Sequence, residues 1–107
     1  MKTAAGFAIV LVTAPNVKSA RRLAQLGLKA RLVACANIVP GLKSHYWWQN
    51  RIETSTETLL LLKTRRTNLA RLEKLILEEH PYDTPEFLVV GINKGNGRYL
   101  HWLGANC

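Results

Sequence analysis

The stretch Pro40–Arg51, which reads Pro-Gly-Leu-Lys-Ser-His-Tyr-Trp-Trp-Gln-Asn-Arg, decides the fold of this 107-residue chain. Gln49 and Asn50 suit a tight hairpin turn, because Asn tolerates the positive φ that such a turn requires. Trp47 and Trp48 precede the turn, and neighbouring residues of a strand face opposite sides of the sheet. The two tryptophan side chains therefore lie on opposite faces of the sheet. We expect another copy of the chain to cover the second face, with ligand-sized gaps where the copies meet.

Outward from this hairpin, apolar periodicity predicts the order β-α-β-β-α-β. Strands are predicted over residues 7–13, 32–48 with an interruption at Pro40-Gly41, 51–63 and 86–92. Helices are predicted around residues 20–28 and 69–76, and a short third helix runs from the cap Asn96 to Gly104. This order is the α+β, ferredoxin-like split βαβ plan, with a four-stranded antiparallel sheet and both main helices on one face. Residues 1–107 form one domain.

The charge of the chain is strongly positive, with fifteen Lys and Arg against seven Asp and Glu. Such a balance favours an anionic partner. The basic residues are nevertheless interleaved with leucines in two groups, as on solvated helix faces. The strand predicted after the turn also has no aromatic ring on which a base could stack, as an RNA-recognition domain would need. We therefore expect no nucleic-acid partner.

Two cysteines, Cys35 and Cys107, are too few for a disulfide framework, so a reducing compartment and a cytoplasmic location are expected. Lys2 and the apolar run from Ala4 to Val12 imitate a secretory signal. We interpret this run instead as a strand that the domain needs, because it is rich in branched residues. No run approaches the roughly 20 apolar residues of a membrane span, so no membrane association is expected.

Four motifs occur together in one order along nearly the whole chain. They are Thr13-Ala14-Pro15, Ala34-Cys35-Ala36-Asn37-Ile38-Val39-Pro40-Gly41, Ser44-His45-Tyr46-Trp47-Trp48, and Leu62-Lys63-Thr64 with His80-Pro81-Tyr82-Asp83-Thr84-Pro85-Glu86. In these motifs the chain resembles the CutA family of divalent-cation tolerance proteins. The resemblance implies a homotrimer built by edge-to-edge pairing of the long strands, and a link to copper and other divalent metals. It also implies a PII-like assembly, similar to the nitrogen-regulatory proteins that bind small ligands in clefts between subunits.

One departure from the family concerns the strand after the turn, which is usually strongly acidic. Here only Glu53 and Glu57 remain, with Thr54, Ser55 and Thr56 among them. We therefore do not expect metal capture by carboxylates at the hairpin tip.

The metal candidates are Cys35, His80 and Glu86. Cys35 is the softest donor in the folded region and suits Cu(I), although it lies in Leu-Val-Ala-Cys-Ala, where cysteine commonly packs as a small hydrophobe. Only the family resemblance supports the metal interpretation of this thiol. No Cys-x-x-Cys or His-x-x-x-His spacing occurs. The expected ion is copper or another divalent metal, and no organic cofactor is implied.

The ligand cleft is predicted where the second helix meets the last strand. Lys63, His80, Tyr82 and Glu86 are expected to converge there, and Tyr46 and Trp48 are expected to line the same cleft. Such a set could bind an anion or a metal, or transfer a proton. Two structural alternatives stay open: Lys63 and Glu86 could form an ion pair at a subunit boundary, and His80 could cap the helix end.

No catalytic arrangement is evident, because neither a Ser-His-Asp nor a Cys-His set can be chosen without arbitrariness. Gly95-Asn96-Gly97 is a turn before a helix and not a phosphate-binding loop. We therefore expect a homotrimeric metal-binding or regulatory protein of divalent-metal tolerance, not an enzyme. The alternative is a PII-like sensor, in which Lys63 and the basic surface hold a small anionic metabolite.

Overall fold

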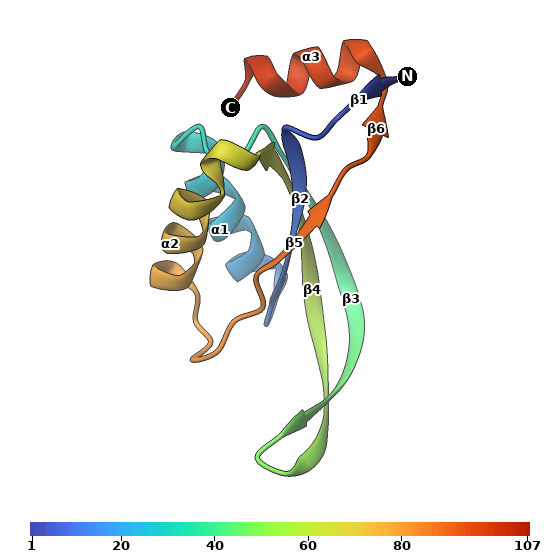
Figure 1. The fold of residues 1–107 in the computed structure, drawn as a ribbon. Helices are drawn as coiled ribbons and strands as arrows, with labels where there is room; N and C mark the ends of the chain where they lie inside the picture. The colour runs from blue at the N-terminus through green and yellow to red at the C-terminus, as the bar shows by residue number, and fades with distance from the viewer.

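The computed structural model describes all residues from Met1 to Cys107 (Figure 1). Its elements are β1 (Lys2–Thr3), β2 (Phe7–Ala14), α1 (Val17–Lys29), β3 (Cys35–Trp48), β4 (Arg51–Arg65), a 3-10 turn (Arg66–Asn68), α2 (Leu69–Glu79), β5 (Leu88–Gly91), β6 (Lys94–Gly95) and α3 (Gly97–Ala105). Four of the strands form an antiparallel sheet in the order β3-β4-β2-β5. The third helix, α3, lies across one end of this sheet. None of the helices is both long and apolar enough to cross a membrane.

The strand order confirms the predicted ferredoxin-like plan. β2 and β3 are both antiparallel to β4, which lies between them, so α1 connects two parallel strands across an inserted third. α2 connects β4 to β5 in the same way across β2. Both helices lie together on one face of the sheet (Figure 1), as the right-handed crossover of such units requires.

The core forms between these helices and one face of the two central strands. Val10 lies opposite Leu62, and Val12 lies opposite Leu60, so all four side chains point to the same face and are buried. From α1, the buried residues Ala20, Leu23, Ala24 and Gly27 recur at helical spacing. Of these, Ala20, Leu23 and Ala24 meet Leu72 and Ile76 of α2 in one cluster.

The helix α1 begins and ends where the sequence provides caps. The Asn16 side chain accepts a hydrogen bond from the Ser19 amide at 2.8 Å, which satisfies one free donor of the first turn. At the other end, Arg31 takes a positive φ of 58° and the Leu32 amide donates to the Gly27 carbonyl. This capping turn delays the next strand, which begins at Cys35 and not at the predicted Leu32.

The predicted hairpin turn is confirmed, because Gln49 and Asn50 both have positive φ values, of 51° and 62°. The predicted interruption at Pro40-Gly41 is a register shift between Val39 and Leu42 inside β3, with Gly41 at a φ of 77°. Beyond the shift the hairpin projects past the other strands (Figure 1). Trp47 is 71% exposed and Trp48 46% exposed in the single chain.

The sheet face opposite the helices remains largely open. It carries Ile9, Leu11 and Leu61 on the central strands, all only partly buried. On the edge strand β5, Leu88 and Val90 are exposed. Only α3 covers part of this face, at the end where Lys63 contacts Tyr99. An apolar face of this kind is typical of a surface that another protein chain covers.

Two features at the chain ends were not predicted. β1 and β6 form a separate two-stranded ribbon, in which Lys2 pairs with Gly95 and Thr3 with Lys94. Strands of two residues carry no readable alternation, so the sequence pattern could not indicate them. The predicted end of the third helix at Gly104 is also one residue early, since α3 continues to Ala105.

We predict that Leu72→Ala destabilises the fold by about 2–5 kcal/mol, because Leu72 is fully buried and its removal leaves a cavity in the core. Leu77→Ala is the matched control: it makes the same chemical change in α2, at a residue that is 47% exposed, and should cost less than about 1 kcal/mol. Urea unfolding of both variants measures the difference. Equal losses would contradict the core described above.

Candidate functional site

The largest cavity, of about 1070 Å³, lies where the long hairpin leaves the rest of the sheet. Three segments line it: the end of β2 around Thr13, the facing residues 42–48 and 55–59 of β3 and β4, and the loop 81–86 that follows α2. We call it the hairpin cleft. Tyr46, Trp48, Tyr82 and Glu86, four of the predicted cleft residues, are among its lining residues.

The hairpin cleft is acidic in a strongly basic protein. None of its 18 lining residues is Lys or Arg, although the chain has fifteen of these. Glu57, Asp83 and Glu86 are on the lining and make up three of the seven acidic residues of the chain. His45 is the one histidine on the lining. The cleft therefore favours a cation over an anion.

A short hydrogen bond joins the two walls of the cleft. The Tyr82 hydroxyl donates to Oε2 of Glu57 at 2.7 Å, and Glu57 is only 8% exposed. Burial above all, and then this bond and the charge of Glu57, raise the pKa of the Tyr82 phenol. The phenol therefore keeps its proton and remains the donor to the carboxylate.

Glu86 is the second carboxyl of the cleft. Burial, and then the negative charge of Glu57, raise the pKa of Glu86. The two carboxyl groups therefore interact unfavourably when both are ionised. A cation placed near them would relieve this repulsion, which is why such pairs are typical of binding sites.

His80 does not contribute a free ring nitrogen to the cleft. Its Nε2 lies 2.8 Å from the Thr13 carbonyl oxygen, and its Nδ1 accepts from the Tyr82 amide at 3.0 Å. A carbonyl can only accept, so these partners assign the proton to Nε2 in a neutral ring. Both nitrogens are thus engaged with backbone groups, and the structure gives His80 the role of holding the loop 81–86 against β2 instead of the predicted metal ligation.

The expectation that Lys63 joins this corner is wrong within one chain. Its ammonium group lies 3.3 Å from the Tyr99 hydroxyl, beside α3. The reason is the register of β4: His80 binds Thr13, which pairs with Leu59. Lys63 follows Leu59 by four residues, about 13 Å along an extended strand.

Cys35 lies directly opposite Lys63, at the same distant end of the sheet. It is partly buried, and its Sγ is 3.7 Å from Oδ1 of Asn37. The predicted metal set of Cys35, His80 and Glu86 is therefore not assembled within one chain. No group of three or more His, Cys, Asp or Glu side chains in the chain is arranged to hold a metal ion.

The sequence analysis missed Glu57 and Asp83 as cleft residues. Glu57 was counted with Glu53 at the hairpin tip, whereas the structure places it opposite Leu42, at the base of the hairpin. Its position two residues before the apolar run Leu59–Leu62 was the available signal, because a carboxylate there adjoins the core. Asp83 lies inside the motif 80–86, but nothing in the sequence distinguished it from an ordinary turn residue.

Comparison with known proteins places this architecture in a family. The family model described as CutA1 divalent ion tolerance protein matches residues 8–106. The divalent-cation tolerance protein CutA of Thermus thermophilus is 42% identical over 98 residues, which cover 92% of this chain and 95% of that protein. Protein CutA 1, chloroplastic, of Oryza sativa is 43% identical over 95 residues, or 89% of this chain. This chain spans about half the length of that plant relative, 54%.

Solved structures agree with the sequence comparison. CutA1 from Oryza sativa superimposes with a TM-score of 0.92 at 40% identity, covering 98% of this chain and 96% of that one. The divalent cation tolerance protein from Thermus thermophilus gives a TM-score of 0.91 at 41% identity, covering 94% of this chain and 97% of that one. Sequence and structure coincide over nearly the full length of this chain, which therefore belongs to the CutA1 family of divalent ion tolerance proteins.

Proposed function

We propose that this protein acts in divalent-cation tolerance by binding a divalent cation in the hairpin cleft, between Glu57 and Glu86. The observation that carries the proposal is the segregation of charge. A chain of net charge +8 excludes every Lys and Arg from the cleft lining and places three carboxylates there. Tyr82 adds a phenol oxygen and orients the Glu57 carboxylate through its hydrogen bond.

The donor set indicates which cations fit. Carboxylate and phenol oxygens suit hard or borderline divalent ions, and an imidazole such as that of His45 extends the range to Cu(II). Cu(I) prefers thiolates, and the one thiol within the sheet, Cys35 of β3, lies beside the opposite end of β4. A Cu(I) site at Cys35 stays a separate prediction, which a thiol-free variant tests.

A homotrimer is part of the proposal. The open sheet face and the exposed Trp47 and Ile52 at the hairpin tip support association of copies of the chain, and the number three comes from the family resemblance. Because no single chain arranges three His, Cys, Asp or Glu side chains around one point, a complete coordination shell needs water or donors from a second copy.

The alternative, a PII-like sensor of a small anionic metabolite, is ranked second. It needs positive charge in the cleft, and within one chain Lys63 binds Tyr99 instead. Lys63 of another copy would have to supply that charge. Binding of an anion to the hairpin cleft, with no cation bound, would favour this alternative.

Two further proposals concern catalytic activity and cellular location. We assign no catalytic activity, since the described family is one of ion tolerance proteins and not a known enzyme family. The cytoplasmic location rests on the unpaired cysteines alone. Cell fractionation tests it, because the relatives include a chloroplastic CutA of Oryza sativa and a periplasmic CutA of Archaeoglobus fulgidus.

The first prediction concerns cation affinity. Glu57→Gln and Glu86→Gln keep the shape of the cleft and each remove one carboxylate, so each should weaken Cu(II) or Mn(II) binding at least about tenfold in calorimetric titration. Glu73→Gln, on the exposed side of α2, removes the same charge elsewhere and should change the affinity little. Cys35→Ser should leave Mn(II) binding intact. Equal weakening by Glu73→Gln, or loss only with Cys35→Ser, would contradict the proposed site.

The second prediction concerns pH. Because the pKa of Glu86 is raised, the folded protein holds this proton to higher pH than the unfolded chain does. Its ionisation therefore lowers the free energy of unfolding as the pH rises from the ordinary value of 4.5 through the raised value. Glu86→Gln removes this cost without a cation present. We expect the variant to be more stable than the wild type above the raised pKa, with a difference that fades below pH 4.5.

Urea unfolding across this pH range, in the presence of a chelator, measures the effect. A variant that is less stable than the wild type at neutral pH would show that Glu86 makes a favourable ion pair in the assembly, and the explanation by repulsion from Glu57 would fall.

The third prediction concerns assembly. Light scattering should report three times the 12.0 kDa chain mass at micromolar concentration. The double variant Trp47→Ser, Ile52→Ser should lower the trimer fraction, because these cross-strand neighbours are 71% and 67% exposed in one chain. At exposed positions an isolated chain would lose only about 0.5 kcal/mol per substitution. A monomeric wild type would remove the support for donors from a second copy.

A further inference from the structure

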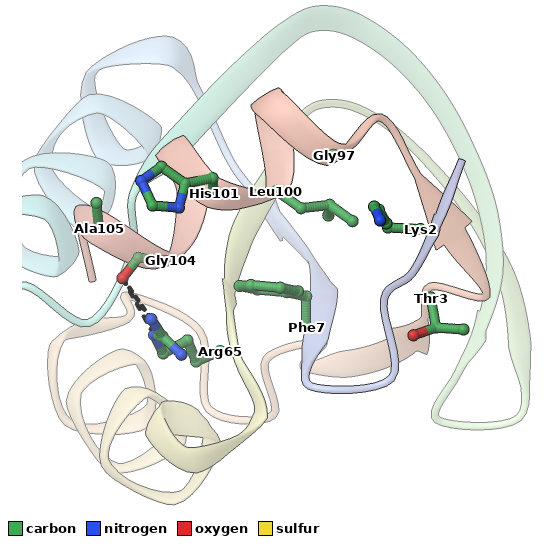
Figure 2. Close-up of a pocket in the computed structure, with 9 residues that line it drawn as sticks. All are labelled: Lys2, Thr3, Phe7, Arg65, Gly97, Leu100, His101, Gly104 and Ala105. Carbon is green, nitrogen blue, oxygen red and sulfur yellow. Dashed lines mark hydrogen bonds between the residues drawn. The ribbon is translucent and has the colours of Figure 1, made fainter.

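A second cavity, of about 430 Å³, lies between α3 and the start of the chain (Figure 2). Its lining residues come from β1, the first residue of β2, the last residue of β4 and α3. It shares no residue with the hairpin cleft. We call it the helix pocket, and its size lies within the range of small-molecule sites.

Two glycines keep the helix pocket open. Gly97 and Gly104 are seven residues apart on α3 and therefore lie on the same helix face. A Cβ atom on Gly97 would lie 3.1 Å from Cγ of Lys2. A Cβ atom on Gly104 would lie 2.7 Å from Nη2 of Arg65 and 3.3 Å from Cζ of Phe7. A side chain at either position would fill part of the cavity.

The helix pocket is lined by two cationic side chains, Lys2 and Arg65, and by the imidazole of His101. No Asp or Glu lines it. Arg65 is held in place by main-chain oxygens: Nη2 donates to Gly104 at 2.6 Å, and Nε donates to Gly104 and to Cys107, the last residue of the chain, each at 3.2 Å. The one ion pair of the protein, Arg22 with Glu79, lies elsewhere. No Asp or Glu side chain therefore pairs with the partly buried guanidinium.

The remaining wall is apolar. The Phe7 ring centroid is 5.6 Å from the Arg65 guanidinium carbon, and Leu100 is nearly buried. Figure 2 shows the Phe7 ring between the side chains of Lys2 and Arg65. A ligand that fits must offer an anionic group to the cations and an apolar body to Phe7 and Leu100.

We propose that the helix pocket binds a small organic carboxylate with an apolar body. The carboxylate would accept hydrogen bonds from the Lys2 ammonium and from the Arg65 guanidinium, whose Nη1 makes no hydrogen bond within the chain. Arg65 also donates hydrogen bonds to Gly104 at the end of α3. A ligand bound to Arg65 would therefore stabilise the end of that helix. This site is independent of the cation site in the hairpin cleft.

Benzoate is the probe, with benzamide as its neutral counterpart and inorganic phosphate as an anion that lacks an apolar body. In amide NMR titration of the full chain, benzoate should shift the signals of Gly97 and Gly104 saturably, whereas benzamide and phosphate should not. Lys2→Met should weaken benzoate about tenfold. Lys94→Met removes the same charge from the neighbouring strand of the ribbon, outside the pocket, and should change the affinity less than about twofold.

Gly97→Ala serves as a second variant that keeps every charge and fills space, and it should also weaken benzoate. Equal effects of Lys2→Met and Lys94→Met would show attraction by net charge alone and would overturn the proposal. Equal binding of benzamide or of phosphate, or no saturable shift, would overturn it as well. Glu86→Gln should leave benzoate binding unchanged, so a failure of the cation site and a failure of this pocket are distinguishable.

Discussion

The antiparallel pairing of β2 with β4 is the constraint on which the rest of this structure depends. With Val10 opposite Leu62, one face of both strands is apolar and fully buried, and α1 and α2 have to cover it. The same register turns Leu11 and Leu61 to the opposite face, where the single chain supplies little cover. It also fixes where β2 stops, and beyond that point β3 and β4 continue alone as a two-stranded ribbon. The hairpin cleft occupies the corner created by this difference in strand length.

The two cavities have opposite polarity and lie toward opposite ends of β4. Glu57 contributes to the acidic cleft and Arg65 to the basic pocket, with about 26 Å of extended strand between them. At physiological ionic strength, interactions between exposed charges fade within about 8 Å. The electrostatic potential in each cavity therefore depends on its own lining residues more than on the net charge of +8. This explains how a basic protein can present an acidic cleft, which composition alone argues against.

The sequence supported the fold well and the site only in part, for identifiable reasons. The strands and helices follow from apolar periodicity, and Asn16 and Asn50 act as the cap and the turn residue that their chemistry favours. Tyr46 and Glu86 reach the cleft as expected. Lys63 does not. The position of the loop after α2 along the sheet depends on two hydrogen bonds, from His80 to the Thr13 carbonyl of β2 and from Tyr82 to Glu57 of β4, and no pattern of residue types encodes such bonds. The pairing of β1 with β6 cannot be predicted from the sequence for the same reason, because it depends on where the tertiary structure places the two segments.

The two-residue turn at Gln49 and Asn50 also bears on the order in which the protein folds. Contacts within the β3–β4 hairpin join residues close in sequence, whereas pairing of β2 with β4 must first close a loop that contains a helix and a strand. Local contacts form faster, because less chain entropy is lost before they are made. The hairpin can thus order while the rest of the chain is still open, with Trp47 exposed and one edge of β3 unpaired. Newly synthesised chains at high local concentration would meet through this edge first, so correct and incorrect association compete from the earliest stage of folding.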